Sequence, residues 1–100
     1  MSSKNYRISE KAIEDLDDIW IYTFKNWSVE QGNRYYNLII NEIEFIADNF
    51  MSGKSMDHIK TGYRASRVKS QMIFFRRAED DKVEVIRVLH QMMDLENRLT

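Results

Sequence analysis

The sequence predicts a small α+β domain in which a short strand precedes two antiparallel helices and three antiparallel strands follow, in the order β-α-α-β-β-β. Two segments, 9–27 and 28–50, carry apolar residues at helical spacing. Three runs rich in β-branched and aromatic residues, at 63–68, 71–78 and 82–89, are typical of strands. Because the connections between these runs are short, we expect an antiparallel meander. One helical hairpin would then pack on one sheet, and residues 1–100 would form a single domain.

The first strand and first helix follow directly from local signals. Tyr6–Ile8 is a short extended run, and Ser9 after it is suited to cap a helix N-terminus. The helix is amphipathic and about five turns long. Its apolar stripe consists of Ala12, Ile13, Leu16, Ile19, Trp20, Thr23, Phe24 and Trp27. The carboxylates of Glu14, Asp15, Asp17 and Asp18 are expected to form a solvated face opposite that stripe.

The second helix begins with a capping box formed by Ser28 and Gln31. The connection to the first helix is so short that the two must form an antiparallel hairpin. The main stripe of this helix is Tyr35, Tyr36, Ile39, Ile43, Ile46, Ala47 and Phe50. Leu38 and Phe45 widen the apolar surface beyond one face, and together with one face of Met72–Phe75 they exceed what a single core needs. Either a partner covers this surface, or it packs under residues 51–61 or the C-terminal tail.

Composition favours a soluble, cytoplasmic protein. The chain is 43% hydrophobic and 31% charged, and it contains no cysteine. Residues 1–7 have no apolar core, so they are not expected to form a signal peptide, and no run is long enough to span a membrane. The net charge of −1 is unevenly divided, because residues 1–50 carry −4 and residues 51–100 carry +3. The basic second half favours an anionic partner.

Arginines in or beside the strands are the first candidate site residues: Arg64, Arg67, Arg76, Arg77 and Arg87. Arg87 alternates with Val83, Val85 and Leu89, so it should point the same way as these apolar residues unless a β-bulge intervenes. An arginine in that position needs a carboxylate, a set of carbonyls or an anionic ligand. The alternative is an arginine at the rim that reaches water or pairs with an acidic residue.

His90 and Trp27 are the other two candidates. His90 follows the last predicted strand, where a histidine could act as a general acid or base or could simply end the strand. Trp27 lies at the tip of the hairpin, where we expect a hydrophobic plug that closes the helix pair. The functional alternative is an exposed anchor for a partner.

Most familiar catalytic constellations are missing from the sequence. There is no cysteine, no serine in a glycine-flanked elbow and no glycine-rich phosphate loop. Neither histidine has the partners or spacing of a metal site, so we expect no metal and no cofactor. These absences favour a protein that works by binding.

At the level of motifs, the chain resembles the ParE toxins of the RelE/ParE superfamily, which belong to bacterial type II toxin–antitoxin systems. The motifs are Y-R-I-S (6–9), A-I-E-D-L-D-D-I-W (12–20), W-S-V-E-Q (27–31), G-Y-R-A-S-R-V (62–68), M-I-F-F-R (72–76) and V-I-R-V-L-H-Q-M-M-D (85–94). The strand ending L-H-x-x-M-D is the most specific of these. Relatives often carry proline where this chain has Phe50-Met51 and Thr61, a departure that concerns loop stiffness.

This resemblance implies a toxin that poisons DNA gyrase through its A subunit, blocks replication and is neutralised by a ParD-like antitoxin. A RelE-like mRNA endonuclease is the alternative, with Arg64, Arg67, Arg76, Arg87 and His90 as its basic groups. No tyrosine follows the last strand to complete that chemistry. A degenerate homologue that binds an antitoxin without being toxic is a third possibility. We expect no membrane contact and no sequence-specific nucleic-acid binding by the chain alone.

The predicted partner-binding residues come from the hairpin tip, the strands and the segment after them. They are Trp27, Arg64, Arg67, Met72, Phe74, Arg76, Arg87, His90, Met93 and Asp94.

Overall fold

The computed structural model describes residues 5–91, 98 and 99. Its elements are β1 (Tyr6–Ile8), α1 (Glu10–Asn26), α2 (Val29–Asp48), the 3-10 helix η1 (Phe50–Ser52), β2 (Lys54–Ser55), β3 (Arg64–Val68), β4 (Gln71–Arg77) and β5 (Val83–His90). The predicted order of a strand, two helices and a meander is confirmed. The short β2 was not predicted. His90 is the last residue of β5, whereas the sequence predicts that it follows the strand.

The sheet has five strands in the order β1-β5-β4-β3-β2. The strands β3, β4 and β5 form the predicted antiparallel meander, and β2 pairs antiparallel with β3. The first strand, β1, lies parallel to β5, so the sheet is mixed. This parallel pairing closes the fold, because α1, α2, β2, β3 and β4 all lie between the two paired strands in the sequence.

A β-bulge in β5 changes which way its side chains point. Phe74 pairs with Arg87 and Phe75 with Val85, so Ile86 has no residue opposite it on β4. Val85 faces the helices, whereas Leu89 belongs to the opposite face of the sheet. The prediction that Leu89 shares a face with Val85 is therefore wrong, and the extra residue is the physical reason. For Arg87 the prediction excepted a β-bulge, and that exception applies, because Arg87 pairs with Phe74 of the second core.

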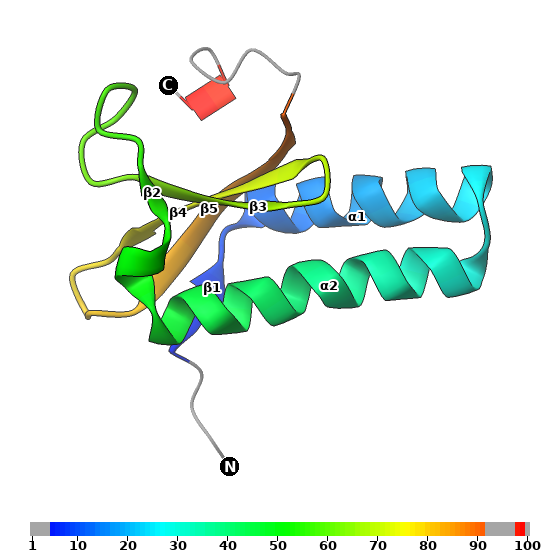
Figure 1. The fold of residues 1–100 in the computed structure, drawn as a ribbon, viewed down its shortest axis with the longest axis horizontal. Helices are drawn as coiled ribbons and strands as arrows, with labels where there is room; N and C mark the ends of the chain where they lie inside the picture. Colours follow the sequence, from blue (N-terminus) through cyan, green and yellow to red (C-terminus); the bar gives the residue numbers. More distant parts are fainter. Residues whose placement is uncertain (1–4, 92–97, 100) are drawn as a thin grey trace.

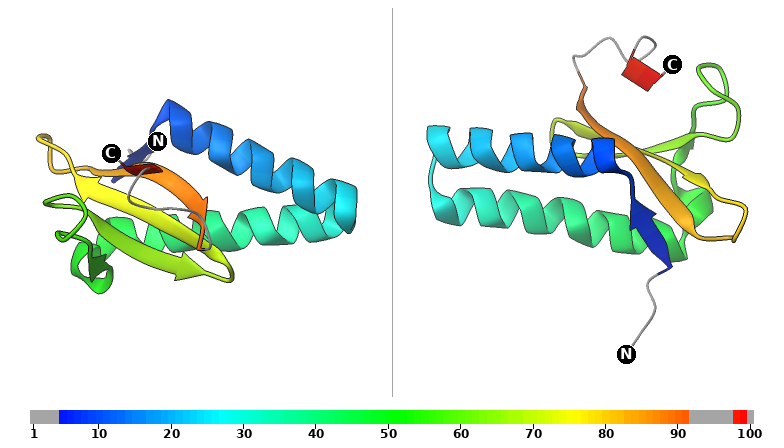
Figure 2. Two further views of the ribbon diagram at one scale, coloured as in Figure 1. Left: turned by 90° about the horizontal axis from the view of Figure 1, so that it is seen from above. Right: turned by 180° about the vertical axis from the view of Figure 1, so that it is seen from behind.

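Both helices begin at serine caps, as predicted. The Ser9 hydroxyl accepts a hydrogen bond from the Ala12 amide at 3.1 Å, and the Ser28 hydroxyl accepts one from the Gln31 amide at 3.1 Å. The helices pack side by side in an antiparallel hairpin, and their connected ends project beyond the sheet (Figures 1 and 2). Within the described residues, neither helix is both long and apolar enough to cross a membrane.

Two hydrophobic cores lie on opposite faces of the sheet, where the sequence predicted one. The main core, between the sheet and the hairpin, comprises Ala12, Leu16, Ile39, Ile43, Ile46, Ile73, Phe75, Val83, Val85 and Val88. The second core comprises Met56, Tyr63, Ala65, Phe74, Leu89 and Leu99. The segment between β2 and β3 covers this second face together with residues 98–99 (Figure 1). The second apolar face of β4 is thus largely covered from within the chain.

A chain of ion pairs links β1, β4, β5 and the turn that precedes β5. The Arg7 guanidinium lies 2.8 Å from the Asp80 carboxylate and 3.8 Å from Glu84, which in turn lies 2.7 Å from Arg76. The hydrogen bond from Arg7 and a second from the Lys82 amide lower the pKa of Asp80.

The pKa of Asp80, measured by NMR titration, is expected to lie below its ordinary value of 3.8. Arg7→Gln should raise it, because the largest cause of the shift is removed. A carboxyl with a lowered pKa stabilises the folded state above its unfolded pKa, and this contribution is lost as pH falls through the folded pKa. The effect on stability should be small and weaken with salt, since the pair is exposed. An Asp80 pKa that is unchanged in Arg7→Gln would contradict this pairing.

Candidate binding groove

A groove of about 900 Å³ lies between the helical hairpin and the end of the sheet where β5 finishes. Helix α1 forms one wall, the start of α2 contributes Gln31 and Tyr35, and the last residues of β5 form the floor. The turn between β3 and β4 closes one side through Ser70. The Tyr35 hydroxyl lies 3.4 Å from the Ser70 hydroxyl, so this contact joins α2 to the turn. The groove is large enough to receive side chains of another polypeptide.

The part of the groove nearest the hairpin tip is aromatic. Tyr22, Trp27 and Tyr35 line it together with Ile19. Tyr22 is 66% exposed and Trp27 is 71% exposed, so both rings are open to solvent. The prediction that Trp27 plugs the end of the hairpin is therefore wrong, because the backbone at residue 27 ends α1 and the indole stays outside the core. Exposed aromatic rings beside a groove are typical of a protein-binding surface.

The other part of the groove is charged. Glu14 and Asp18 project from successive turns of α1, and Lys11 and Arg98 also line the groove. Among the described residues, neither Glu14 nor Asp18 forms a salt bridge. The groove thus offers apolar contacts at one end and charges of both signs at the other.

Asp15 and Arg87 join α1 to the floor of the groove. The Arg87 guanidinium donates two hydrogen bonds to the Asp15 carboxylate, at 2.8 and 2.9 Å, and both side chains are largely buried. The same carboxylate accepts a hydrogen bond from the Val88 amide at 3.0 Å. The hydrogen bond to Asp15 is the largest cause that raises the pKa of Arg87. Arg87 therefore has the carboxylate that its position was predicted to require.

The edge of β5 explains why the Asp15 carboxylate lies against Val88. Because β1 ends at Ile8, no strand among residues 5–91, 98 and 99 pairs with the second half of β5 on that side. Ser9 continues the edge by donating its amide to the Val85 carbonyl and its hydroxyl to the Ile86 carbonyl. Asp15 then takes the Val88 amide. The start of α1 thus substitutes for a strand along this edge.

Three of the predicted site residues line the groove: Trp27, Arg87 and His90. Three others do not. Arg64 donates to the Gly53 carbonyl at 2.9 Å, Arg67 donates to the Lys69 carbonyl at 2.7 Å, and Arg76 pairs with Glu84. The structure therefore does not bring the strand arginines together in one site.

The remaining predicted site residues have other surroundings. Phe74 is fully buried in the second core, and Met72 packs against the same core. Met93 and Asp94 lie outside the described residues. Leu38 and Phe45, expected to exceed the needs of the core, remain 39% and 51% exposed. No group of three or more acidic or histidine side chains that could hold a metal ion occurs in the described part of the chain.

Sequence reasoning missed Asp15 and Tyr22 as groove residues. Asp15 was assigned to the solvated acidic face of the first helix, yet its side chain is only 13% exposed. One signal could have found it. Arg87 needed a carboxylate, and Asp15 lies one residue before the core residue Leu16, at the margin between the apolar stripe and the acidic face.

The fold and groove define a small α+β protein with an open, amphipathic surface beside its helical hairpin. A family model described as "ParE toxin of type II toxin-antitoxin system, parDE" matches residues 6–95. The chain therefore belongs to the ParE toxin family of type II toxin–antitoxin systems, and the resemblance seen in its motifs is confirmed.

Named relatives support this assignment over most of the chain. Toxin ParE1 of Caulobacter vibrioides is 41% identical over 91 residues, which are 91% of this chain and 93% of the relative. Toxin ParE1 of Mycobacterium tuberculosis is 34% identical over 97 residues, covering 97% of this chain and 99% of the relative. A solved chain from the "Chromosomal ParDE TA system from P. aeruginosa" matches with a TM-score of 0.75, covering 87% of this chain and 95% of that one. At 16% identity, this last match shows the shared fold alone.

Proposed function

We propose that this chain is a toxin that poisons DNA gyrase through its A subunit and so blocks replication, and that a ParD-like antitoxin neutralises it. Membership of the ParE toxin family is the observation that carries this proposal. The toxin acts by binding its target, without catalysis of its own. It works in the cytoplasm, where gyrase and its DNA are found.

The groove supports the antitoxin half of the proposal. An antitoxin segment that lies in it would cover the exposed rings of Tyr22 and Trp27 and place polar side chains against Glu14 and Asp18. Burial of aromatic anchors supplies most of the affinity at such interfaces. The Asp15–Arg87 pair would then form a rigid floor for the complex.

The positions of the basic residues support binding over RNA cleavage. Ribose activation and phosphate stabilisation need several basic groups converging on one place. Arg76 is paired with Glu84 and Arg87 with Asp15, while Arg64 donates to backbone carbonyls. His90 lines the groove, but only one of the four proposed arginines, Arg87, lines it too.

Inhibition of DNA supercoiling tests the target directly. The purified chain is expected to inhibit supercoiling by gyrase, or to trap gyrase on cleaved DNA, and the antitoxin should relieve the effect. Expression without antitoxin should induce the DNA damage response before translation stops. No effect on gyrase at excess toxin, combined with mRNA cleavage in a translating extract, would instead assign the chain to the RelE-like endonucleases.

Truncation of the exposed aromatic residues tests the groove. Tyr22→Ala combined with Trp27→Ala is expected to weaken antitoxin binding by at least about 100-fold, because hot-spot aromatic residues contribute about 2 kcal/mol or more each. Phe24→Ala is the matched control, since Phe24 is 42% exposed on the same helix but does not line the groove. Isothermal titration calorimetry measures both. Equal affinities for the double variant and the control would place the antitoxin elsewhere.

A further inference from the structure

Helix α1 carries an exposed apolar face on a different side from the groove. Its side chains recur at helical spacing, and with two residues of α2 they form what we call the outer face of the hairpin: Ile13, Asp17, Trp20, Ile21, Phe24, Asn33 and Tyr36. Ile13, Ile21 and Phe24 are 47%, 43% and 42% exposed. None of the residues of the outer face lines the groove. An exposed apolar surface of this kind needs a partner that the groove does not supply.

The aromatic part of the outer face is held in place by the hairpin itself. The Trp20 ring stacks on the Phe24 ring with the centroids 5.2 Å apart, and its Nε1 donates a hydrogen bond to the Asn33 side chain at 3.0 Å. A Cβ at Gly32 would lie 3.4 Å from the Trp20 Nε1, so the glycine lets the two helices approach closely here. An open depression of about 550 Å³ lies beside these rings. Because the rings are already fixed, a partner would lose little entropy in ordering them.

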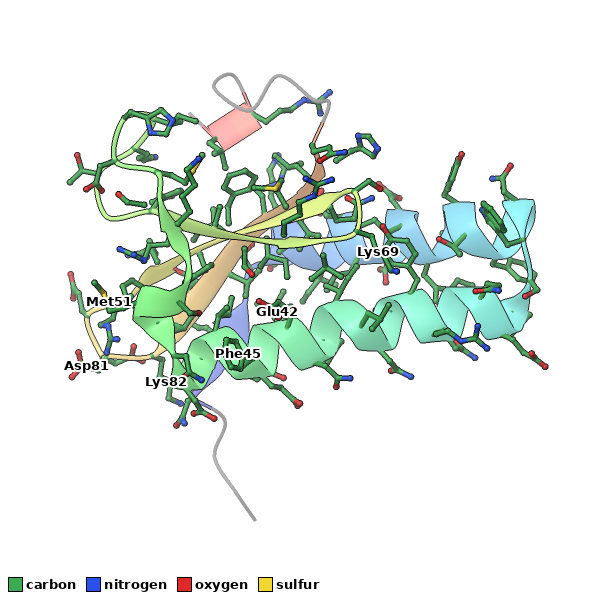
Figure 3. All side chains as sticks on the ribbon, viewed as in Figure 1. Glu42, Phe45, Met51, Lys69, Asp81 and Lys82 are labelled. Carbon is green, nitrogen blue, oxygen red and sulfur yellow. The ribbon has the colours of Figure 1, made fainter. Side chains whose placement is uncertain are left out.

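The charge of the hairpin indicates which partner fits. Residues 10–48 carry three Lys or Arg and nine Asp or Glu, a net charge of −6, whereas the rest of the chain carries +5. Asp17 and Glu10 are exposed on or beside the outer face, and neither forms a salt bridge among the described residues. Figure 3 shows Lys69 and Lys82 away from this face, on the turns at the two ends of β4. The outer face would therefore repel nucleic acid or a second outer face, and attract a protein surface that carries lysine and arginine.

We propose that the toxin contacts its target through the outer face, and that the matching surface of the target protein has an apolar centre surrounded by basic side chains. The proposal rests on the proposed function, because an enzyme that handles DNA presents lysine and arginine to the phosphate backbone. Ile13, Ile21 and Phe24 supply the apolar contacts. The stacked Trp20 ring supplies a rigid anchor, and the Asp17 carboxylate meets a basic side chain of the target.

The same arrangement accounts for neutralisation by an antitoxin that lies in the groove. Trp27 lines the groove and follows Phe24 by three residues, so it borders both surfaces. A partner anchored on Trp27 would crowd the end of the outer face at the hairpin tip, which projects beyond the sheet (Figure 2). Antitoxin and target would thus contact different residues and still exclude each other.

Substitutions on the outer face test the proposal in the whole chain. Asp17→Lys and Ile21→Lys are each expected to raise the toxin concentration that half-inhibits supercoiling at least about tenfold, because they remove a contact and repel a basic surface. Growth arrest on expression without antitoxin should need correspondingly more toxin, measured by immunoblot. Affinity for the antitoxin, measured by isothermal titration calorimetry, should be unchanged, since neither side chain lines the groove.

Two matched controls separate the outer face from a general effect of added charge. Glu79→Lys makes the same change of charge as Asp17→Lys, at an exposed position outside the hairpin. Leu38→Lys replaces an apolar residue of α2 that is 39% exposed, close to the exposure of Ile21. Both controls should inhibit gyrase as the wild-type toxin does. All four positions are exposed, so the circular dichroism spectra of the variants should match that of the wild type.

The outcomes distinguish a wrong surface from a wrong target. Wild-type potency of Asp17→Lys and Ile21→Lys against gyrase would overturn the outer face and leave gyrase as the target. If the wild-type toxin arrests growth without inhibiting gyrase, the proposed target is wrong, and growth arrest decides the surface: weaker arrest by the variants supports the outer face, and equal arrest overturns it. Loss of antitoxin affinity in both variants, or a wild-type dimer that Ile21→Lys dissociates, would assign the outer face to another partner and overturn the proposal.

Discussion

Phe74→Ala is expected to lower the free energy of unfolding by about 3–5 kcal/mol, because it removes a large side chain and leaves a cavity that its neighbours only partly fill. Phe74 is fully buried in the second core and pairs across the sheet with Arg87 on one side and Ala65 on the other. Urea unfolding followed by circular dichroism measures the change. A loss of this size approaches the whole stability of a domain of 100 residues.

Phe74→Ala also tests whether the second core stabilises the fold or only covers a partner-binding face. If the second core were a loose cover over a partner-binding face, Phe74→Ala would cost little stability and would mainly weaken partner binding. Phe74→Leu is the milder variant, since it keeps most of the apolar volume and should leave the protein folded for binding measurements. A cost below about 1 kcal/mol for Phe74→Ala would contradict the buried position and restore Phe74 as a candidate contact residue.

The overall fold could be predicted from the sequence because its signals are local. Ser9 and Ser28 mark the helix starts, the short connection forces the hairpin, and two short turns force the meander. The parallel pairing of β1 with β5 could not be predicted, since it joins residues that lie more than 70 positions apart with no local signal. The position of the bulge at Ile86 could not be predicted either, because every residue of β5 suits a regular strand.

The candidate site was predicted less completely for the same reason. Trp27 and His90 could be singled out by residue type and place in the chain, and both line the groove. Phe74 was misjudged, because the sequence does not show that residues far away in the chain, such as Met56 and Leu99, cover the outer face of the sheet. The arginines look alike in sequence. Only tertiary structure separates Arg87, paired in the groove floor, from Arg76, paired on an exposed surface.

Asp15→Ala is expected to cost about 2–4 kcal/mol of unfolding free energy, since it leaves a largely buried guanidinium without its carboxylate and the Val88 amide without an acceptor. Asp15→Asn should cost less, because the amide oxygen can still accept one hydrogen bond. Arg76→Ala is the control. It breaks a pair in which Arg76 is 41% exposed, so the expected loss is at most about 1 kcal/mol.

A double variant tests whether the cost comes from the uncompensated charge. Replacing Asp15 by leucine and Arg87 by methionine removes both charges, so the double variant should be more stable than Asp15→Leu alone. The edge of β5 would still lose the acceptor of the Val88 amide, and the recovery should therefore be incomplete. If the double variant were no more stable than Asp15→Leu, the charge on Arg87 would not be the source of the loss. The contribution of Asp15 would then lie in its hydrogen bond to the strand edge.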